Sequence, residues 1–492
     1  MRSFKNWLQN HLTYCLLAVI LVAALFLRIY KLDQLLGFYY DQGRDALVVW
    51  RLIHEGKFFL VGPVTGIEGV FLGPFYYYLI APFYFLGGGS PVFVAAVLNL
   101  FSVFGIYLLY LVAKEFFDRK VAVLGSFFVA FSYSLVVFSR WLSHPPLLPT
   151  FSLLIIYAFL QIYRGQEKWW LGVGLIEGLC LQLEAAAAVF FLPTILIFYF
   201  WQRKRTNFLI IAASLLLFLL TLAPQIIFNW RHQGILQETF RKFLVSEKSF
   251  SLPLFELARQ RLVTYFDVSF SRFFYAQKNL SIVWFLTLLV LGFLKRREIF
   301  TGERRILAFW LLVPLAGYLF YQGNYGYFWD YYLSGVWLVF IILVAFLLVS
   351  FWPKIWGKLI FFLFLASFLY VNFAQFLIYY RIGIGIILRD QLAAIDWIYQ
   401  DAKSTDFNVD IYVPPVIPYA YDYLFKWYGT GKHGQEPLEK RTSLLYTLYE
   451  IDSSHPERLE SWLTRQKGIG KTIYEKSFGG VTVQRRERME SK

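Results

Sequence analysis

Long apolar runs constrain this chain more than any other feature, because about 20 such residues in a row are enough to cross a bilayer. Hydrophobic residues make up 58% of the sequence and charged residues only 16%, whereas roughly a quarter of an average soluble protein is charged. The sequence therefore predicts an α-helical polytopic membrane protein and excludes soluble, disordered and nucleic-acid-binding classes. Eleven runs are long enough to span: Leu12–Ile29, Val92–Ala113, Val121–Phe138, Leu147–Tyr163, Trp169–Leu183, Ala187–Trp201, Phe208–Asn229, Ile282–Leu294, Ile306–Phe320, Tyr332–Val349 and Leu359–Leu377.

The distribution of basic residues predicts how these spans are oriented, since cytoplasmic loops collect Lys and Arg. A twelfth apolar stretch, Phe71–Leu86, contains Gly73 and Pro74 and is ambiguous. If it does not span, the basic clusters of alternate connections all fall on one side, and if it does, early and late clusters fall on opposite sides. We therefore predict a multi-pass protein of the cell membrane with its N-terminus inside, its C-terminus outside and two long outer loops, residues 31–90 and 230–281.

Two elements of the first outer loop are expected to lie along the membrane surface. From Arg44 to Glu55, apolar residues repeat at helical spacing opposite charged ones, which is typical of an interfacial helix. Phe71–Leu86 is the second such element. Both would hold this loop at the depth where lipid head groups meet water.

The final segment, residues 382–492, differs from the membrane domain that precedes it, residues 1–381. It holds fifteen basic and fifteen acidic residues, so the net charge of +15 lies in the membrane domain. Its pattern predicts a small extracytoplasmic α/β domain, whose aromatic residues either bind an acceptor or form the domain's own core. The expected helices are Arg389–Asp401, Ala420–Trp427 and Pro456–Gln466, and the expected strands are Phe407–Val413, Lys471–Tyr474 and Gly480–Gln484.

Polar residues gather at the outer ends of the spans. The four clusters are residues 39–45, 139–146, 182–184 and 324–332, while no nucleotide-binding glycine loop, serine-hydrolase elbow or metal-spaced Cys/His set occurs in the sequence. Asp41 comes just before the first interfacial helix, where a lipid carrier and a water-borne acceptor can meet. The alternative is that Asp41 or Asp45 caps this helix, because Asp is a favoured N-cap residue.

These residue types suit the transfer of a sugar from a lipid phosphate to a hydroxyl. The reaction needs a base for the acceptor's proton and groups that hold the departing phosphate. A phosphate leaves without protonation, so one carboxylate is enough, and Asp41 is the expected base in a direct, inverting attack. Arg44, Arg140 and His144 are the candidate donor-phosphate ligands, although an arginine at the end of a span is often a snorkelling anchor.

Other polar residues of the outer clusters are candidates for lining the substrate site. Tyrosines at these depths commonly form the interfacial aromatic belt instead. An intramembrane carboxylate, Glu177, is expected to be a structural partner inside the bundle. The candidate lining residues are Asp45, Glu184, Tyr325, Asp330, Tyr331 and Tyr332.

The pattern resembles a known family. An acidic residue in the first outer loop, Asp41, is followed three positions on by Arg44 and about thirty residues later by Leu72–Tyr77, with the sequence LGPFYY. Together with many spans and an outer C-terminal unit, this is similar to the GT-C glycosyltransferases. The nearest group is glycosyltransferase family 39, with the protein O-mannosyltransferases and the aminoarabinose transferases of lipid A. The resemblance covers roughly residues 12–380.

The resemblance implies that the protein takes a hexosyl or pentosyl group from a polyprenyl-phosphate carrier on the outer face and passes it to a protein, lipid or glycan acceptor. It places the family's first-loop Asp on Asp41 and the Arg of its D-x-x-R pattern on Arg44. Gln42 stands where the family has a second acidic residue, and His144 near where it has an acidic residue after the third span. No cofactor is expected, and a divalent metal is left open.

Two further functions stay open. A ligase or polymerase of lipid-linked glycans would use similar outer-face chemistry with a pyrophosphate-linked donor. A transporter or flippase predicts ionisable residues at the bilayer midplane and two related halves, but apart from Glu177 the ionisable residues lie at the rims. The expected partners are the polyprenyl-phosphate-sugar donor, the acceptor and the bilayer, without nucleic acid.

Overall fold

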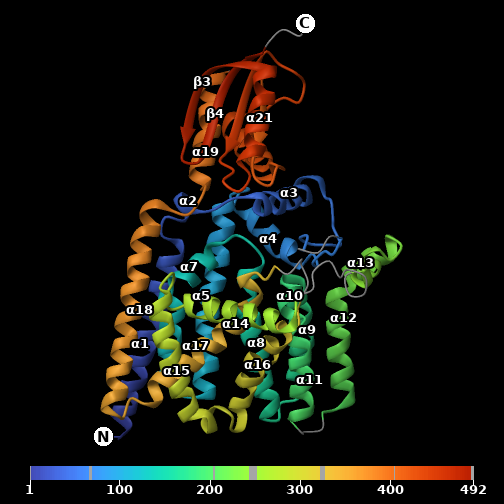
Figure 1. Ribbon diagram of the computed structural model, residues 1–492. Helices are drawn as coiled ribbons and strands as arrows, with labels where there is room; N and C mark the ends of the chain where they lie inside the picture. Colours follow the sequence, from blue (N-terminus) through green and yellow to red (C-terminus); the bar gives the residue numbers. More distant parts are fainter. Residues whose placement is uncertain are drawn as a thin grey trace.

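The computed structural model describes residues 2–65, 69–202, 206–242, 252–321, 327–403 and 405–488. It consists of a bundle of long helices and a small α/β domain that stands on one end of it, with the N-terminus at the opposite end (Figure 1). The helical elements of the bundle are α1 (Arg2–Ile29), α2 (Leu32–Leu35), α3 (Tyr40–Glu55), α4 (Phe75–Leu86), α5 (Pro91–Phe116), α6 (Arg119–Phe131), α7 (Tyr133–Arg140), η1 (Pro145–Leu147), α8 (Leu148–Tyr163), α9 (Trp169–Leu183), α10 (Ala185–Ala188), α11 (Phe191–Trp201), α12 (Phe208–Arg231), α13 (Ile235–Arg241), α14 (Leu254–Ser271), α15 (Lys278–Ile299), η3 (Gly302–Arg304), α16 (Arg305–Tyr318), η5 (Asp330–Leu333), α17 (Ser334–Ser350) and α18 (Ile355–Ile382).

All eleven apolar runs predicted from the sequence are helical, but they do not all form long straight helices. Within the described residues, seven helices are long and apolar enough to cross a membrane, or eight if the bent pair α6–α7 counts as one span. The helices Phe75–Leu86, Trp169–Leu183 and Ala185–Trp201 are apolar but shorter. The protein is therefore a multi-pass membrane protein, while eleven crossings with an inner N-terminus remain a prediction.

The bend of 62° between α6 and α7 is held from both sides by polar side chains. Arg28 of α1 is only 1% exposed and donates to the carbonyls of Val129 and Ala130, at the C-terminal end of α6. Asn372 of α18 accepts from the backbone N–H of Tyr133 at 2.6 Å. Because helix ends leave backbone groups unpaired, these contacts make the break a fixed corner and direct α7 toward the polar turn that follows it.

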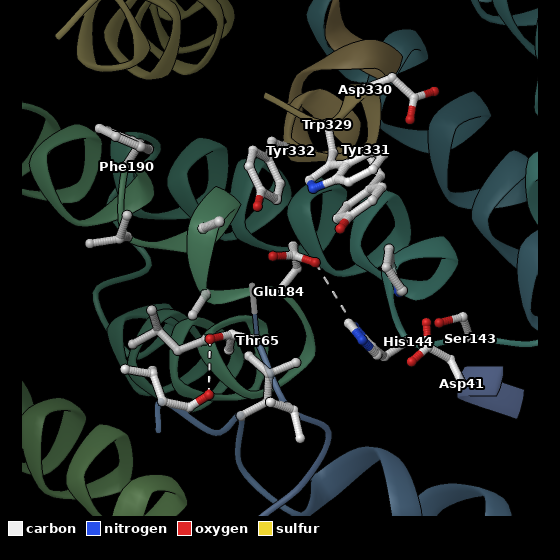
Figure 2. A pocket seen from close by; sticks show the side chains of 18 of the residues that line it. Asp41, Thr65, Ser143, His144, Glu184, Phe190, Trp329, Asp330, Tyr331 and Tyr332 are labelled. Carbon is white, nitrogen blue, oxygen red and sulfur yellow. Dashed lines mark hydrogen bonds and ion pairs between the residues drawn. The ribbon is translucent and has the colours of Figure 1, made fainter. Parts of the chain in front are cut away.

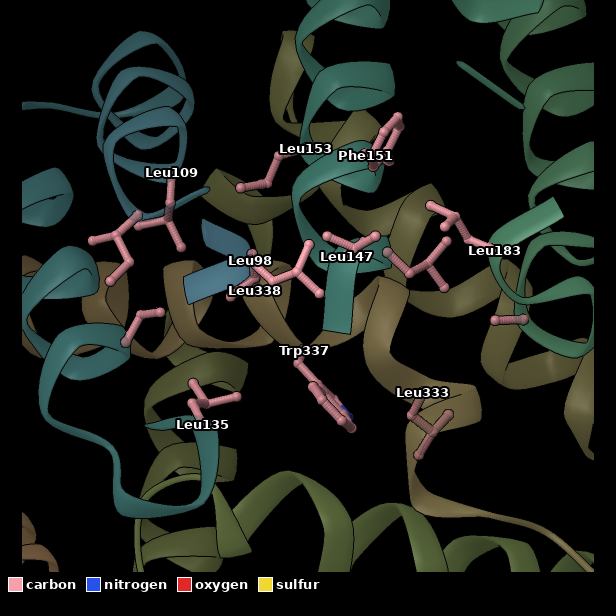
Figure 3. Packing of buried hydrophobic residues seen from close by; sticks show 14 of the residues in the cluster. Leu98, Leu109, Leu135, Leu147, Phe151, Leu153, Leu183, Leu333, Trp337 and Leu338 are labelled. Carbon is pink, nitrogen blue, oxygen red and sulfur yellow. The ribbon is translucent and has the colours of Figure 1, made fainter. Parts of the chain in front are cut away.

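The core of the bundle is formed by α5, α8 and α17. Figure 3 shows leucines of these helices interdigitating, among them Leu98, Leu153 and Leu338. In the most apolar window of α17, 78% of residues are buried inside the protein, against 6% in α12. Helix α17 is thus a central helix and α12 an edge helix.

The connections rich in basic residues meet at the end of the bundle opposite the α/β domain (Figure 1). Arg164 links two of them, because its guanidinium lies 2.6 Å from Glu115 and 3.3 Å from Glu303. Arg304 donates to the carbonyl of Phe116. The charge asymmetry that the sequence predicts is therefore an asymmetry of the folded molecule.

The C-terminal domain is the expected α/β unit, but one of the two inner strands of its sheet, β2, was not predicted. Its sheet has the order β1-β2-β4-β3, with β1 parallel to β2 and the other pairs antiparallel. The seven residues of β2 alternate poorly, so only their content of Leu, Tyr and Thr signals a strand. Its elements are α19 (Leu388–Ala402), β1 (Phe407–Tyr412), α20 (Tyr419–Leu424), the π-helical η6 (Phe425–His433), β2 (Leu444–Glu450), α21 (Pro456–Ile469), β3 (Gly470–Phe478) and β4 (Val481–Arg488).

The domain is fastened to the membrane part through α3 and the turn between α4 and α5. Gly43 of α3 lies so close to α20 that a Cβ there would be 2.3 Å from the backbone N of Ala420. Trp427 donates to the carbonyl of Gly88 at 2.7 Å, and Tyr423, which is 1% exposed, donates to that of Gly89. The domain's aromatic residues therefore pack its core and its attachment, and they fix the position of α3.

Candidate active site

A cavity of about 1030 Å³ opens near the end of the bundle that carries the C-terminal domain. Figure 2 shows its polar side chains converging from elements far apart in the sequence. It gathers most of the candidate residues predicted from the sequence. Its lining includes Asp41, Arg44, Thr65, Val70, Leu72, Phe138, Trp141, Ser143, His144, Glu184, Phe190, Tyr321, Trp329, Asp330, Tyr331 and Tyr332.

Helix α3 forms one wall and begins earlier than predicted, at Tyr40. Its cap is neither Asp41 nor Asp45, because the side chain of Gln42 accepts from the backbone N–H of Tyr39 at 3.0 Å. Gln42, which replaces an acidic residue of the family pattern, thus has a structural role here. The side chain of Asp41 is left 52% exposed at the cavity wall.

Arg44 is the central charge of this wall. Its guanidinium lies 2.9 Å from the carboxylate of Asp41 and 2.7 Å from that of Asp45. Burial opposes the charge on Arg44, but Asp45, Tyr77 and Asp41 outweigh it and raise the pKa of Arg44. Arg44 therefore stays cationic while two carboxylates share its charge.

Asp45 supports Arg44 from behind and does not line the cavity, which corrects the expectation that it does. It is 3% exposed and accepts a hydrogen bond of 2.9 Å from the hydroxyl of Tyr77. Burial raises the pKa of Asp45 to about 6, although Arg44 favours its ionised form. Asp45 and Tyr77 together orient the guanidinium.

The facing wall carries His144 and Glu184, from the turns before α8 and α10. The ring Nδ1 of His144 lies 4.0 Å from a carboxyl oxygen of Glu184, as the dashed line in Figure 2 marks. Burial lowers the pKa of His144 to about 3, although a hydrogen bond with the backbone of Leu183 acts against this. Burial also raises the pKa of Glu184 to about 8. At neutral pH both side chains are thus mainly uncharged, and His144 does not act as a cation.

The buried Nδ1 of His144 has no hydrogen-bond partner within the described part of the chain. In a neutral imidazole one ring nitrogen donates and the other accepts. Nδ1 therefore offers an open hydrogen-bonding position that faces Glu184 across a gap too long for a direct hydrogen bond.

Aromatic rings form a third wall. Trp329 and Tyr331 stack with ring centroids 6.2 Å apart, and Tyr331 also contacts Trp141 at 5.6 Å. Asp330 lies between them in sequence and also lines the cavity, with its carboxylate 3.0 Å from Arg272, which was not among the residues selected from the sequence. Tyr332 lines the cavity too, whereas Tyr325 lies outside the described residues.

Arg140, which the sequence analysis named as a candidate phosphate ligand, does not line this cavity. It is 3% exposed and donates to the carbonyls of Leu27, Tyr30 and Lys31 at the end of α1. It therefore anchors α7 to α1. Glu177 is also remote from the cavity, and neither of its carboxyl oxygens has a partner among the described residues.

The described residues contain no group of three or more His, Cys, Asp or Glu side chains that could hold a metal ion. The chemistry available in the cavity is that of two exposed carboxylates, Asp41 and Asp330, each beside a guanidinium, together with an uncharged His–Glu pair and an aromatic surface.

The fold of this chain is similar to that of solved structures of other membrane proteins. The chain is similar to the crystal structure of ArnT from Cupriavidus metallidurans bound to undecaprenyl phosphate, with a TM-score of 0.60 and 12% identity over 95% of this chain and 97% of that one. It is also similar to the archaeal oligosaccharyltransferase AglB from Archaeoglobus fulgidus in complex with an inhibitory peptide and a dolichol-phosphate. That match has a TM-score of 0.51 and 13% identity over 97% of this chain and 74% of AglB.

A comparison of the sequence with protein-family models indicates which family part of the chain resembles. Residues 72–228 match the family model described as dolichyl-phosphate-mannose-protein mannosyltransferase. No curated protein matches the sequence significantly. The resemblance to GT-C glycosyltransferases of the family 39 kind is thus confirmed, and at these identities the similar structures establish the fold.

Proposed function

We propose that the protein transfers a sugar from a polyprenyl-phosphate carrier to an acceptor hydroxyl in this cavity. The observation that carries the proposal is the exposed carboxylate of Asp41 beside the anchored guanidinium of Arg44 in one cavity of suitable size. The fold shared with a structure that binds undecaprenyl phosphate supports the choice of carrier.

Asp41 is the proposed general base. The acceptor oxygen attacks the anomeric carbon, the bond between that carbon and the phosphate oxygen breaks, and polyprenyl phosphate leaves with the electron pair. The acceptor's proton passes to Asp41. The stereochemistry at the anomeric carbon inverts, because the attack is direct and passes through no enzyme-bound sugar.

Arg44 is the proposed phosphate ligand and also controls Asp41. Asp45 holds Nε and Nη2 of Arg44 at 2.9 and 2.7 Å, whereas Asp41 contacts Nη1 at the cavity side. A donor phosphate that binds Nη1 replaces Asp41 there, since both are anions that match the guanidinium fork. Donor binding thereby frees the carboxylate to act as a base.

Glu184 and His144 are the proposed recognition element for a sugar hydroxyl. An oxygen atom about 2.8 Å from each group fits into their 4.0 Å gap. That hydroxyl would accept from the protonated carboxyl of Glu184 and donate to Nδ1 of His144. The stacked rings of Trp329 and Tyr331 offer a flat surface for the sugar ring beside it.

We place this reaction on the extracytoplasmic side of the membrane. The cavity is lined by residues of α3, which contacts α20 of the C-terminal domain. The connections rich in basic residues lie at the opposite end of the bundle (Figure 1). Basic connections favour the cytoplasmic side. The ionisable residues of the site lie at the end of the bundle, where a transferase needs them, and not at mid-depth, where a transporter does.

The proposal is tested with purified protein in liposomes supplied with labelled polyprenyl-phosphate sugars. We expect the wild type to release polyprenyl phosphate and Asp41→Asn to lose about 10²- to 10⁴-fold in kcat while still binding the donor. Asp33→Asn, an exposed carboxylate outside the cavity, is the matched control. Unchanged turnover by Asp41→Asn, or a donor that changes leaflet without being cleaved, would contradict the proposal.

A further inference from the structure

A second cavity, of about 680 Å³, lies in the seam between α1 and α18. It shares no lining residue with the candidate active site. Its walls are apolar rings and aliphatic side chains, including Leu27, Leu369, Phe373 and Leu377. A groove of this composition between two long apolar helices faces the hydrocarbon of the bilayer.

The length of the groove matches one leaflet. Along α18 its lining residues extend from Leu369 to Arg381, and twelve residues of helix rise about 18 Å. One leaflet contributes about 15 Å of hydrocarbon. The groove therefore runs from near the bilayer centre to the head-group region.

The mouth of the groove is positive. Lys31 and Arg381 line the same cavity, while none of its lining residues is acidic. The ammonium of Lys31 donates to the carbonyl of Tyr380 at 3.2 Å, which holds it near the end of α18. A lone Lys or Arg at a helix end is commonly a snorkelling anchor, but here Lys31, in the turn after α1, and Arg381, on α18, line the same apolar groove.

The amide on the floor of the groove needs no hydrogen bond from a ligand. Asn372 lines it, but its oxygen accepts from the Tyr133 N–H and its nitrogen donates to the carbonyls of Phe273 and Phe368. The cavity therefore has a positively charged end and a floor on which the amide of Asn372 is already fully hydrogen-bonded. This combination suits a lipid with an anionic head group and apolar chains.

We infer that this groove binds an anionic phospholipid, with one acyl chain along α18 and the phosphate between Lys31 and Arg381. The inference rests on the fit of charge, polarity and length, and it is independent of the proposed transferase activity. The lipid phosphate would lie beside the end of α1, where the carbonyls of Tyr30 and Lys31 accept hydrogen bonds from Arg140 of α7.

The test is native mass spectrometry of the full-length protein in detergent, with added phosphatidylglycerol or phosphatidylcholine. We expect the wild type to retain one phosphatidylglycerol in preference to phosphatidylcholine. The double variant Lys31→Gln/Arg381→Gln should bind phosphatidylglycerol about 10- to 30-fold more weakly. Lys426→Gln/Arg389→Gln, which removes two positive charges from the C-terminal domain away from this cavity, is the matched control.

A second variant separates the groove from its charges. Leu377→Trp fills the groove and keeps both cations, so it should also reduce phosphatidylglycerol retention, and thermal melts establish that each variant is folded. Equal retention of the two lipids by the wild type, or retention unchanged in the double variant, would overturn the inference. Displacement of the bound phospholipid by equimolar undecaprenyl phosphate would assign the groove to the carrier lipid instead.

Discussion

The two facing walls of the active-site cavity accommodate buried ionisable groups differently: one wall uses ion pairs, and on the other wall the groups lose their charge. On α3, Arg44 pairs with the carboxylates of Asp41 and Asp45 and stays cationic, because these partners outweigh the burial of its guanidinium. Across the cavity, His144 and Glu184 lie 4.0 Å apart and lose their charges, because burial shifts the pKa of each toward the neutral form. A charged wall can hold a phosphate and accept a proton, whereas a neutral wall suits hydroxyl groups.

The largest effect is expected from the charged wall. Arg44→Lys keeps the charge but loses the fork that contacts two carboxylates, so donor phosphate loses a planar ligand. We expect kcat/KM for the donor to fall about 10- to 100-fold. Arg51→Lys, an exposed change on the same helix, is the control, and equal activity of the two variants would remove Arg44 from the mechanism.

The neutral wall should respond to loss of a donor but not to loss of charge. We expect Glu184→Ala to lower kcat/KM about tenfold, while Glu184→Gln, which keeps a donor, stays within about threefold of the wild type. If Glu184 acts as a carboxylate, both variants would fall equally. Steady-state kinetics with a short-chain polyprenyl-phosphate-mannose separates these outcomes.

The pH dependence of kcat/KM tests the same difference between the charged and the neutral wall. Because the pKa of Glu184 is raised to about 8, its donating form is present below that pH and is lost as the pH rises through it. Wild-type kcat/KM should therefore fall above about pH 8, and Glu184→Gln should lack this decline. The titratable or charged groups that surround Glu184 are His144, Tyr318, Tyr321 and Tyr331, with Asp41 and Arg44 across the cavity.

The C-terminal domain contacts α3, which forms the charged wall. We expect a substitution at this contact to have a smaller effect on activity. Gly43→Ala would place a Cβ 2.3 Å from the backbone N of Ala420 and push α3 away from α20. We expect activity to fall about 3- to 10-fold together with a lower melting temperature. Gly431→Ala has no atom within 4 Å of its Cβ and serves as the control.

The smallest effect on activity is expected at Arg140, which belongs to neither wall. Arg140→Gln loses charge-assisted hydrogen bonds to the carbonyls at the end of α1, so the melting temperature should fall. We expect kcat/KM to change less than about threefold, since no ligand contact is removed. A loss of donor affinity as large as that of Arg44→Lys would indicate that Arg140 binds the donor.

Residues that act within one element were predictable from the sequence. Asp41 and Arg44 were both selected as candidates, although their ion pair depends on α3 beginning at Tyr40, earlier than predicted. The helix α19 follows from its hydrophobic period. The N-cap of α3 was missed, because it is Tyr39 and not an aspartate, and Gln42 at the third helical position accepts from the backbone N–H of Tyr39.

Residues that meet across elements were not predictable. His144 and Glu184 come from different turns, and only the packing of α8 and α9 brings them together. Arg44 and Arg140 both lie near the outer ends of spans, yet one faces the cavity and the other faces the end of α1.

The sequence by itself determined that the chain crosses a membrane repeatedly, where its basic connections lie and which outer segments carry polar residues, because hydrophobic length and charge are local properties of the chain. The tertiary structure alone decided which polar residues share a cavity and which keep their charge. That depends on burial and on partners distant in sequence, since desolvation by the surrounding fold, and not residue type, sets the charge of His144 and Glu184.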